Sequence, residues 1–478
     1  MTKGKEKNMF ELLVKNALII TVDQKHTIYK NGFMASKDGK IAMIGDMADM
    51  PENIQAEKVI DACGKALLPG IIDTHGHGGH CLMKTLGEHL NNGWEPMAEG
   101  IYHNYTDSDF WYAEAALASA ERVKFGVTTG VSMIGNTARL GDLDIIEAHI
   151  EGTLKTGIRH MTGVGCPNPK WNKPARKWLS RDRYEEYEVT PETAFEFTPK
   201  AMKKFVGKYD KCDFVVMPSR MGRDRLNPDE LNIRQNKAMF ELAQEYGTVI
   251  HSHSFSGDMN FMMETSPEVF KNRMFLAHCT GMLPEEWDIM AANPVSVCHG
   301  PSTNANVRVR CPAVEMLEKG VNVVVATDGT APDRNFDLLK DIKLFQFLHQ
   351  GFFHDAGILQ AGLVLEMITI RAAKAMGKEK EIGSLEIGKN ADAIIINCRQ
   401  PHLAPWGVMP VQRIVNHAEG GDVSHTIVGG KVIMENRVLT QTSEEQIISD
   451  AEKAFDLMCE RSGVLDYAVE NERLWQIK

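Results

Sequence analysis

The 478-residue sequence lacks the features of several common protein classes. Its nine cysteines form no Cys-x-x-Cys pair, and an odd, scattered set suits reduced thiols better than a disulfide framework. No run approaches the ~18 uncharged apolar residues of a membrane span, and the first residues lack the apolar core of a secretory signal. The 53 lysines and arginines are outnumbered by 64 aspartates and glutamates, and the resulting net charge of −11 disfavours binding to nucleic acid. We therefore expect a cytoplasmic protein with no nucleic-acid partner and no membrane partner.

Both ends of the chain consist of short apolar runs separated by turn residues, which is typical of β-strands. Turns such as Lys37-Asp38-Gly39-Lys40 divide the first end, and paired glycines at 420–421 and 429–430 divide the second. We expect the two ends to pair in one β-sandwich built from residues 1–65 and 384–442. Residues 443–478 are expected to form a C-terminal helix and tail.

The middle of the chain, residues 66–383, alternates apolar, β-branched runs with longer amphipathic segments. Eight strand–helix units close most naturally as a (β/α)₈ TIM-type barrel, with an open doubly wound sheet as the alternative. The expected fold class is therefore α/β, a barrel joined to a β-sandwich from both chain ends. The eight apolar runs cover residues 66–73, 127–134, 159–165, 213–218, 248–255, 274–278, 295–299 and 321–328.

The longest interruption of this strand–helix rhythm covers residues 166–212. It mixes proline, tryptophan, arginine and glutamate without helical or alternating periodicity. Such a segment can fold over the mouth of a barrel as a lid or wall, or it can remain a surface excursion or an oligomer contact. Both interpretations stay open on the sequence.

Histidines and one aspartate stand at the ends of four of the eight apolar runs. Side chains two residues apart on a strand share one face, so the His-x-His pair after the first run can bring both imidazoles to one cation. The carboxyl ends of barrel strands meet on one face, which makes residues remote in sequence neighbours there. Burying so many ionisable groups together is costly unless a cation or substrate satisfies them. These residues are His75, His77, His251, His253, His278 and Asp328.

The sequence around these residues resembles the amidohydrolase superfamily. The resemblance rests on Leu-Pro-Gly-Ile-Ile-Asp at 68–73 before the His-x-His pair, Gly-Val-Thr-Thr at 126–129, Ala-Thr-Asp-Gly at 326–329 and the segment 381–392. It spans about residues 10–440 and is closest to the chlorohydrolase and aminohydrolase branch, which includes cytosine and triazine deaminases. The resemblance implies a metal-bearing (β/α)₈ barrel capped by a β-sandwich, a small-molecule substrate and a homo-oligomer.

The resemblance also implies roles for the clustered residues. His75, His77, His253 and Asp328 would hold one divalent transition metal ion, with Zn²⁺ expected first and Fe²⁺, Co²⁺ or Mn²⁺ as alternatives. Asp328 would take a proton from the metal-bound water, and His278 would hydrogen-bond that water or polarise the substrate.

Two neighbouring residues leave alternatives open. His251 lies on the same strand face as His253, so it either competes with it as a ligand or supports the site from behind. Cys166 follows the third apolar run and could bridge a second metal as a thiolate, although a buried, inert thiol is the simpler interpretation. Because no lysine ends the fourth run, a carboxylated lysine cannot bridge two metals there, and one metal is expected.

The sequence departs from the family pattern after the fifth strand. Deaminases of this branch carry glutamate three residues after the strand-five histidine, whereas this chain has Ser256, whose hydroxyl cannot replace a carboxylic acid in proton transfer near neutral pH. Asp258 or Glu264 could supply the acid instead. The missing glutamate favours hydrolysis of a C–N bond in a small amide, urea or carbamate, and residues 94–105 and 165–171 look similar to phenylurea and thiocarbamate hydrolases. The alternatives are deamination of an N-heterocycle such as a pyrimidine, triazine or guanine-like ring, and a non-catalytic barrel scaffold.

Other polar and aromatic residues near the predicted strand ends are candidates for substrate binding. His80 is either a further pocket donor or a loop histidine, and the arginines near 220–225 either bind a substrate oxygen or form a solvated rim. The residues that we expect to contact substrate are Trp94, Arg220, Ser256, His299 and Asn304.

Overall fold

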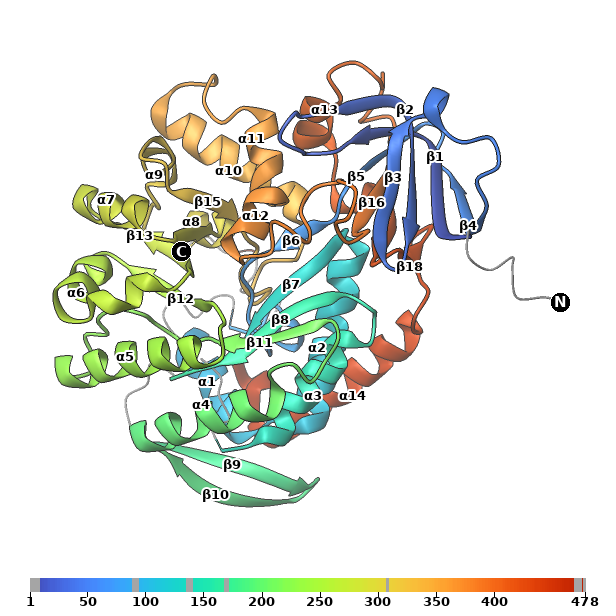
Figure 1. The fold of residues 1–478 in the computed structure, drawn as a ribbon. Helices are drawn as coiled ribbons and strands as arrows, with labels where there is room; N and C mark the ends of the chain where they lie inside the picture. Colours follow the sequence, from blue (N-terminus) through green and yellow to red (C-terminus); the bar gives the residue numbers. More distant parts are fainter. Residues whose placement is uncertain are drawn as a thin grey trace.

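The computed structural model describes residues 9–87, 94–134, 141–166, 172–306, 309–467 and 475. Its central element is a sheet of eight parallel strands (Figure 1). In chain order the strands are β6 (Ile71–Asp73), β7 (Val127–Met133), β8 (Arg159–Val164), β11 (Cys212–Val216), β12 (Ile250–Phe255), β13 (Met274–Thr280), β14 (Val295–His299) and β15 (Asn322–Val325).

The first and last strands of this sheet approach each other, so that the sheet is nearly closed. The backbone N–H of Asp328, just after β15, donates a hydrogen bond to the carbonyl oxygen of His75, just after β6, across 3.1 Å. Inside the sheet, alternate strand residues form an apolar core that includes Ile72, Met161 and Phe275. The (β/α)₈ barrel expected from the eight apolar runs is confirmed.

Helices that alternate with the strands surround the barrel (Figure 1). The second helix begins where the carboxylate of Asp107 accepts a hydrogen bond from the backbone N–H of Phe110, and its Trp111 is fully buried against the barrel core. The helices of the described chain are α1 (Trp94–Asn104), α2 (Ser108–Lys124), α3 (Leu143–Leu154), α4 (Pro191–Phe205), α5 (Asp229–Glu245), α6 (Asp258–Thr265), α7 (Pro284–Ala292), α8 (Pro301–Asn306), α9 (Ala313–Glu318), α10 (Leu338–Phe353), α11 (Ala361–Met367), α12 (Ile370–Ala375), α13 (Pro410–His417) and α14 (Glu444–Ser462).

The two chain ends meet in a second sheet of nine strands, beside the barrel in Figure 1. The ends are joined by β5 and β16, which pair antiparallel with Leu68 opposite Ile394. The expected pairing of the chain ends is therefore confirmed. The strands are β1 (Phe10–Ile20), β2 (Ile28–Lys37), β3 (Lys40–Asp46), β4 (Ala56–Asp61), β5 (Lys65–Pro69), β16 (Ala393–Asn397), β17 (Val423–Val428), β18 (Lys431–Glu435) and β19 (Val438–Leu439).

Polar contacts fix this sheet and the last helix to the barrel. Arg159 of β8 pairs with Asp392 before β16, with Nε and Oδ2 3.0 Å apart. Lys124 at the end of α2 pairs with Glu444 at the start of α14, with 2.9 Å between Nζ and Oε2. Among the helices of the described residues, none combines the length and the apolar character needed to cross a membrane.

Part of the interruption at 166–212 forms an antiparallel hairpin of β9 (Lys173–Ser180) and β10 (Arg183–Val189), which projects from the lower edge of the molecule in Figure 1. The indole N–H of Trp178 donates to the carbonyl oxygen of Asn104 at the end of α1 across 2.8 Å, and the guanidinium of Arg461 from α14 lies 3.8 Å from the Trp178 ring centre. The hairpin is therefore a surface excursion held against α1 and α14. Residues 167–171 of the interruption lie outside the described residues.

We predict that two glycine-to-alanine changes in helices have opposite effects on stability. A Cβ at Gly152 of α3 would lie 2.2 Å from the carbonyl oxygen of Tyr112 in α2, so Gly152→Ala should destabilise the protein by about 1–3 kcal/mol through overpacking. A Cβ at Gly362 of α11 meets nothing within 4 Å, so Gly362→Ala should stabilise by about 0.4–1 kcal/mol. Melting temperatures of both variants test this, and a Gly152→Ala variant as stable as wild type would contradict the close helix contact.

Candidate active site

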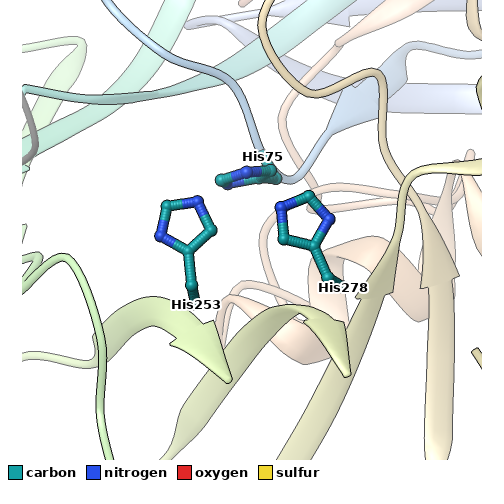
Figure 2. A group of neighbouring side chains, drawn as sticks. All are labelled: His75, His253 and His278. Atoms are coloured by element: carbon teal, nitrogen blue, oxygen red, sulfur yellow. The ribbon is translucent and has the colours of Figure 1, made fainter. Parts of the chain in front are cut away.

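Five side chains meet at the carboxyl ends of four barrel strands. His75 and His77 follow β6, His253 lies on β12, His278 lies on β13 and Asp328 follows β15. Figure 2 shows that the imidazoles of three of them point toward a common centre from different elements. All five side chains are nearly inaccessible to solvent. The structure therefore brings together the residues that the sequence selected.

Distances within the cluster fit a single metal ion. Oδ1 of Asp328 lies 3.3 Å from Nε2 of both His75 and His77, and Nε2 of His253 lies 3.2 Å from Nε2 of His77. An ion about 2.0–2.1 Å from four tetrahedral ligands would separate neighbouring ligand atoms by about 3.3–3.4 Å. Nε2 of His75 has no hydrogen-bond partner among the described residues, which leaves its lone pair for a cation. The donor set of three imidazoles and one carboxylate suits zinc and similar ions.

His251 fixes the tautomer of His75. A backbone carbonyl can only accept, so His251 carries its proton on Nδ1 and donates it to the Phe275 oxygen across 2.7 Å. Nε2 of His251 then accepts from Nδ1 of His75 across 2.8 Å, which leaves Nε2 of His75 unprotonated. His251 therefore supports His75 from behind, and His253 is the residue of that strand that faces the centre.

His253 is oriented in the same way by a carbonyl group. Its Nδ1 donates to the carbonyl oxygen of Ser219 across 2.6 Å, so its Nε2 is also unprotonated and faces His77. Burial lowers the pKa values of His75, His251 and His253. A neutral imidazole is the form in which histidine binds a metal ion.

Both carboxylate oxygens of Asp328 have defined partners. The backbone N–H of Gly329 donates to Oδ1 across 2.7 Å, and the hydroxyl of Thr303 donates to Oδ2 across 2.7 Å. Oδ2 also faces Nε2 of His278 at 3.9 Å. The backbone at Asp328 has φ +66°, an uncommon conformation for a residue other than glycine. Oδ1 is thus the oxygen turned to the metal ligands, and Oδ2 is the oxygen turned to His278.

Trp94 and His80 form an aromatic wall beside the cluster. The imidazole of His80 stacks on His77 with ring centres 4.9 Å apart, and Trp94 meets His80 edge to face at 5.5 Å. Nδ1 of His80 is buried without a partner among the described residues, and it lies so close to Gly329 that any side chain there would collide with it.

The two residues expected to bind substrate after strand seven face different surroundings. The ring of His299 turns to α10, where its Nε2 lies 3.2 Å from Nε2 of His349 and its ring meets Phe345 edge to face, with centres 5.1 Å apart. Asn304 lies on α8, and both polar atoms of its amide are buried without a partner in the described chain. Asn304 therefore has hydrogen-bonding capacity left for a ligand, whereas His299 uses Nε2 within the protein.

The region of the missing glutamate contains a closed ion pair. Arg220 binds both carboxylate oxygens of Asp258, at 3.0 and 2.9 Å, and the N–H of Phe255 donates to the same carboxylate. Ser256 is exposed, and Glu264 is exposed on α6. Asp258 is therefore paired with Arg220. Neither Asp258 nor Glu264 lies beside the cluster as a free carboxylic acid.

Cys166 is fully buried at the end of β8, and burial raises the pKa of its thiol to about 12. A neutral thiol is favoured there, in line with the simpler interpretation of this residue.

Sequence reasoning missed Thr303, although the Gly-Pro-Ser-Thr-Asn segment at 300–304 had already been selected for Asn304. The hydrogen bonds to the backbone carbonyl groups of Ser219 and Phe275 could not be predicted from the sequence, because every residue type has such a group.

A buried carboxyl group supports the loop that carries the first ligands. Glu114 of α2 is fully buried and accepts hydrogen bonds from the backbone N–H groups of Gly79 and Cys81. Its Oε2 lies 3.7 Å from Nδ1 of the equally buried His149. Burial raises the pKa of Glu114 to about 7.

We predict that removing His251 weakens metal binding without unfolding the barrel. In His251→Leu the Nδ1–H of His75 loses its acceptor, so the affinity for zinc should fall about 10- to 100-fold. Competition with a chelator measures the affinity, and circular dichroism checks the fold. His354→Ala, which changes an exposed histidine at the end of α10, serves as the control. Equal zinc affinity in wild type and His251→Leu would contradict the assigned tautomer.

We also predict a pH-dependent contribution of Glu114 to stability. Because folding raises this pKa from 4.5 to about 7, the carboxyl contributes stability that is fully present below the lower value and is lost as the pH rises through the higher one. Glu114→Gln stays neutral, so its melting temperature should gain on wild type between about pH 5 and about pH 8. Glu151→Gln on the exposed face of α3 is the control, and parallel pH profiles for Glu114→Gln and wild type would refute the raised pKa.

Two curated proteins that are similar to this chain are named as deaminases. The chain is 29% identical over 469 residues to a 5'-deoxyadenosine deaminase of Methanosarcina acetivorans, covering 95% of this chain and 100% of that protein. It is 28% identical over 459 residues to a 5-methylthioadenosine/S-adenosylhomocysteine deaminase of Acetivibrio thermocellus, covering 91% and 96%.

Solved structures share the fold. An adenosine deaminase from Xanthomonas campestris with bound zinc superposes with a TM-score of 0.80 at 18% identity, covering 95% of this chain and 99% of that one. The atrazine chlorohydrolase from Arthrobacter aurescens TC1 complexed with zinc gives a TM-score of 0.75 at 19% identity, covering 93% and 100%. The model of the "Amidohydrolase family" matches residues 66–433, and the chain belongs to that family of enzymes.

Proposed function

We propose that the protein is a metal-dependent deaminase that replaces the exocyclic amine of an adenine nucleoside with oxygen from water. The observation that carries the proposal is the convergence of His75, His77, His253 and Asp328, with ligand atoms 3.2–3.3 Å apart. The names of the two relatives, both deaminases of adenosine derivatives and matched over nearly their whole length, support the substrate class. They favour the deamination alternative over the amide, urea or carbamate hydrolysis that Ser256 had favoured.

We propose zinc as the metal because both similar solved structures contain it and because the donor set fits it. Such an ion, when bound, lowers the pKa of a coordinated water to about 7 and polarises the group under attack. His75, His77 and His253 would present neutral nitrogens to it, and Asp328 would present Oδ1.

The protein's own residues then move the protons. Oδ2 of Asp328 would accept a proton from the attacking water while the water oxygen bonds to the amine-bearing carbon of the purine ring. The same oxygen would return the proton to the amine, which leaves as ammonia while the ring carbon keeps the new oxygen. His278, 3.9 Å from Oδ2, would hydrogen-bond the developing oxygen. Trp94 and Asn304 are the proposed substrate contacts, since the ring of the first and the free amide of the second remain available.

A second candidate is hydrolysis of an acyclic amide, urea or carbamate, which needs no protonation of a ring. It is favoured by Ser256 in place of a glutamate and by the Arg220–Asp258 pair, which occupies the carboxylate of Asp258. In that reaction the leaving amine would take its proton from Asp328.

We predict that the zinc-loaded protein releases ammonia from adenine nucleosides such as 5'-deoxyadenosine and 5'-methylthioadenosine. Asp328→Asn should lower kcat at least about 100-fold, because the base is lost, and His354→Ala should leave it unchanged. Ser256→Glu should raise kcat for the nucleosides, because a carboxyl returns to the position that deaminases of this branch use. A coupled ammonia assay and the ultraviolet change of the purine ring measure both.

The same panel contains a phenylurea and a carbamate, for which amine release is measured. Amine release from these compounds without ammonia from any nucleoside would replace the proposal with the second candidate. Absence of turnover together with absence of bound metal in the purified protein would support the non-catalytic scaffold.

A further inference from the structure

We infer that Thr303 is a positioning residue that assigns different tasks to the two oxygens of Asp328, directing Oδ1 to the metal and Oδ2 to the reacting proton. This inference rests on the proposed function only in making Asp328 the base for the attacking water. It holds equally for nucleoside deamination and for hydrolysis of an acyclic C–N bond, because both draw a proton from water.

The contacts of Asp328 divide its two oxygens. Oδ1 lies 3.3 Å from Nε2 of His75 and of His77 and accepts the N–H of Gly329 across 2.7 Å. Oδ2 lies farther from Nε2 of His278, at 3.9 Å, and accepts the hydroxyl of Thr303 across 2.7 Å. Each oxygen thus has one short hydrogen bond from the protein, and the two bonds come from opposite ends of the carboxylate.

Two such bonds fix the rotation of a carboxylate about its Cβ–Cγ bond. With Gly329 alone, the group could turn around Oδ1 or exchange its two oxygens, which would place the proton-accepting oxygen away from the water. The Thr303 hydroxyl occupies the lone pair of Oδ2 on the side of α8. The lone pair that remains on Oδ2 is the one available to the proton in transfer. Charge-assisted hydrogen bonds of this kind are short and comparatively strong, and neither residue is more than 5% exposed.

The residues on either side of Thr303 make contacts outside the site. The neighbouring hydroxyl of Ser302 donates to Oδ1 of Asp341 on α10 across 2.5 Å, and the backbone N–H of Asn304 donates to the carbonyl oxygen of Gly300 across 2.9 Å. Thr303 and Ser302 therefore direct adjacent hydroxyls in two directions, one into the site and one to the surrounding helix. Ser302→Ala removes the second contact alone and supplies a matched control.

The test compares Thr303→Val, which keeps the shape and loses the hydroxyl, with Thr303→Ser, which keeps the hydroxyl. On the best substrate of the panel, we expect Thr303→Val to lower kcat about 10- to 100-fold at unchanged KM and unchanged zinc content. Thr303→Ser should retain activity close to wild type, and Ser302→Ala should do the same. The positioning role would be overturned if kcat fell equally in Thr303→Val and Thr303→Ser, or if it fell as much in Ser302→Ala. It would also be overturned if Thr303→Val lost zinc and changed KM together with kcat.

A second measurement does not depend on turnover. In a crystal structure of the zinc-loaded Thr303→Val variant, the carboxylate of Asp328 should be turned relative to the zinc-loaded wild type, with Oδ1 still near the ion. An unchanged carboxylate orientation would overturn the inference. If no compound of the panel is turned over, the proposed function fails while this structural comparison still decides the role of Thr303.

Discussion

The site depends on one electrostatic constraint, the packing of unprotonated nitrogens and a carboxylate oxygen against one another without solvent. Nε2 of His75 faces Oδ1 of Asp328 across 3.3 Å, and the proton of His75 lies on the other side of its ring, where Nδ1 donates to Nε2 of His251. Two lone pairs at that distance repel, and buried polar groups without partners cost about 1–3 kcal/mol each. A cation between them turns each repulsion into a bond. The arrangement is therefore built for a bound ion and is costly without one.

The barrel supplies rigid support for this arrangement from behind. The guanidinium of Arg122, fully buried on α2, contacts the carboxylate of Asp73 on β6 at 3.2 Å. The same carboxylate accepts the backbone N–H and the hydroxyl of Thr327, at 3.1 and 2.8 Å. Since Asp73 precedes His75 by two residues and Thr327 precedes Asp328 by one, this buried pair connects the ligands of the first strand to the ligand of the last. The ring of strands is completed by polar contacts at the level of the site.

The sequence predicts the cluster because its histidines and aspartate can be recognised directly. The alternation of side chains along a strand and the closure of the barrel then place these residues together. A His-x-His pair at a strand end needs only the alternation of side chains, and four strand ends meet whenever eight such units close. What the sequence cannot predict are contacts through backbone carbonyls, such as that of Ser219, and hydroxyl contacts such as that of Thr303, because any residue type could provide the former and many the latter. The hairpin of β9 and β10 escaped prediction because its many charged residues, which follow no regular period, are typical of a solvated loop, and only the contacts of Trp178 with α1 and α14 show otherwise.

The proposed metal ligands and the position of the missing glutamate lie in different parts of the chain, so serine at position 256 leaves the ligand cluster intact. The ligands sit at the ends of strands whose positions are fixed by the barrel core, whereas Ser256 is exposed in the turn between β12 and α6. The carboxylate of Asp258, which follows that turn, accepts hydrogen bonds from two backbone N–H groups and from two nitrogens of Arg220, so it shapes the loop instead of donating protons. Under the proposed function, proton transfer then falls to Asp328, the one carboxylate of the described cluster. This makes the orientation of its Oδ2 more important here than in an enzyme with a second carboxylic acid.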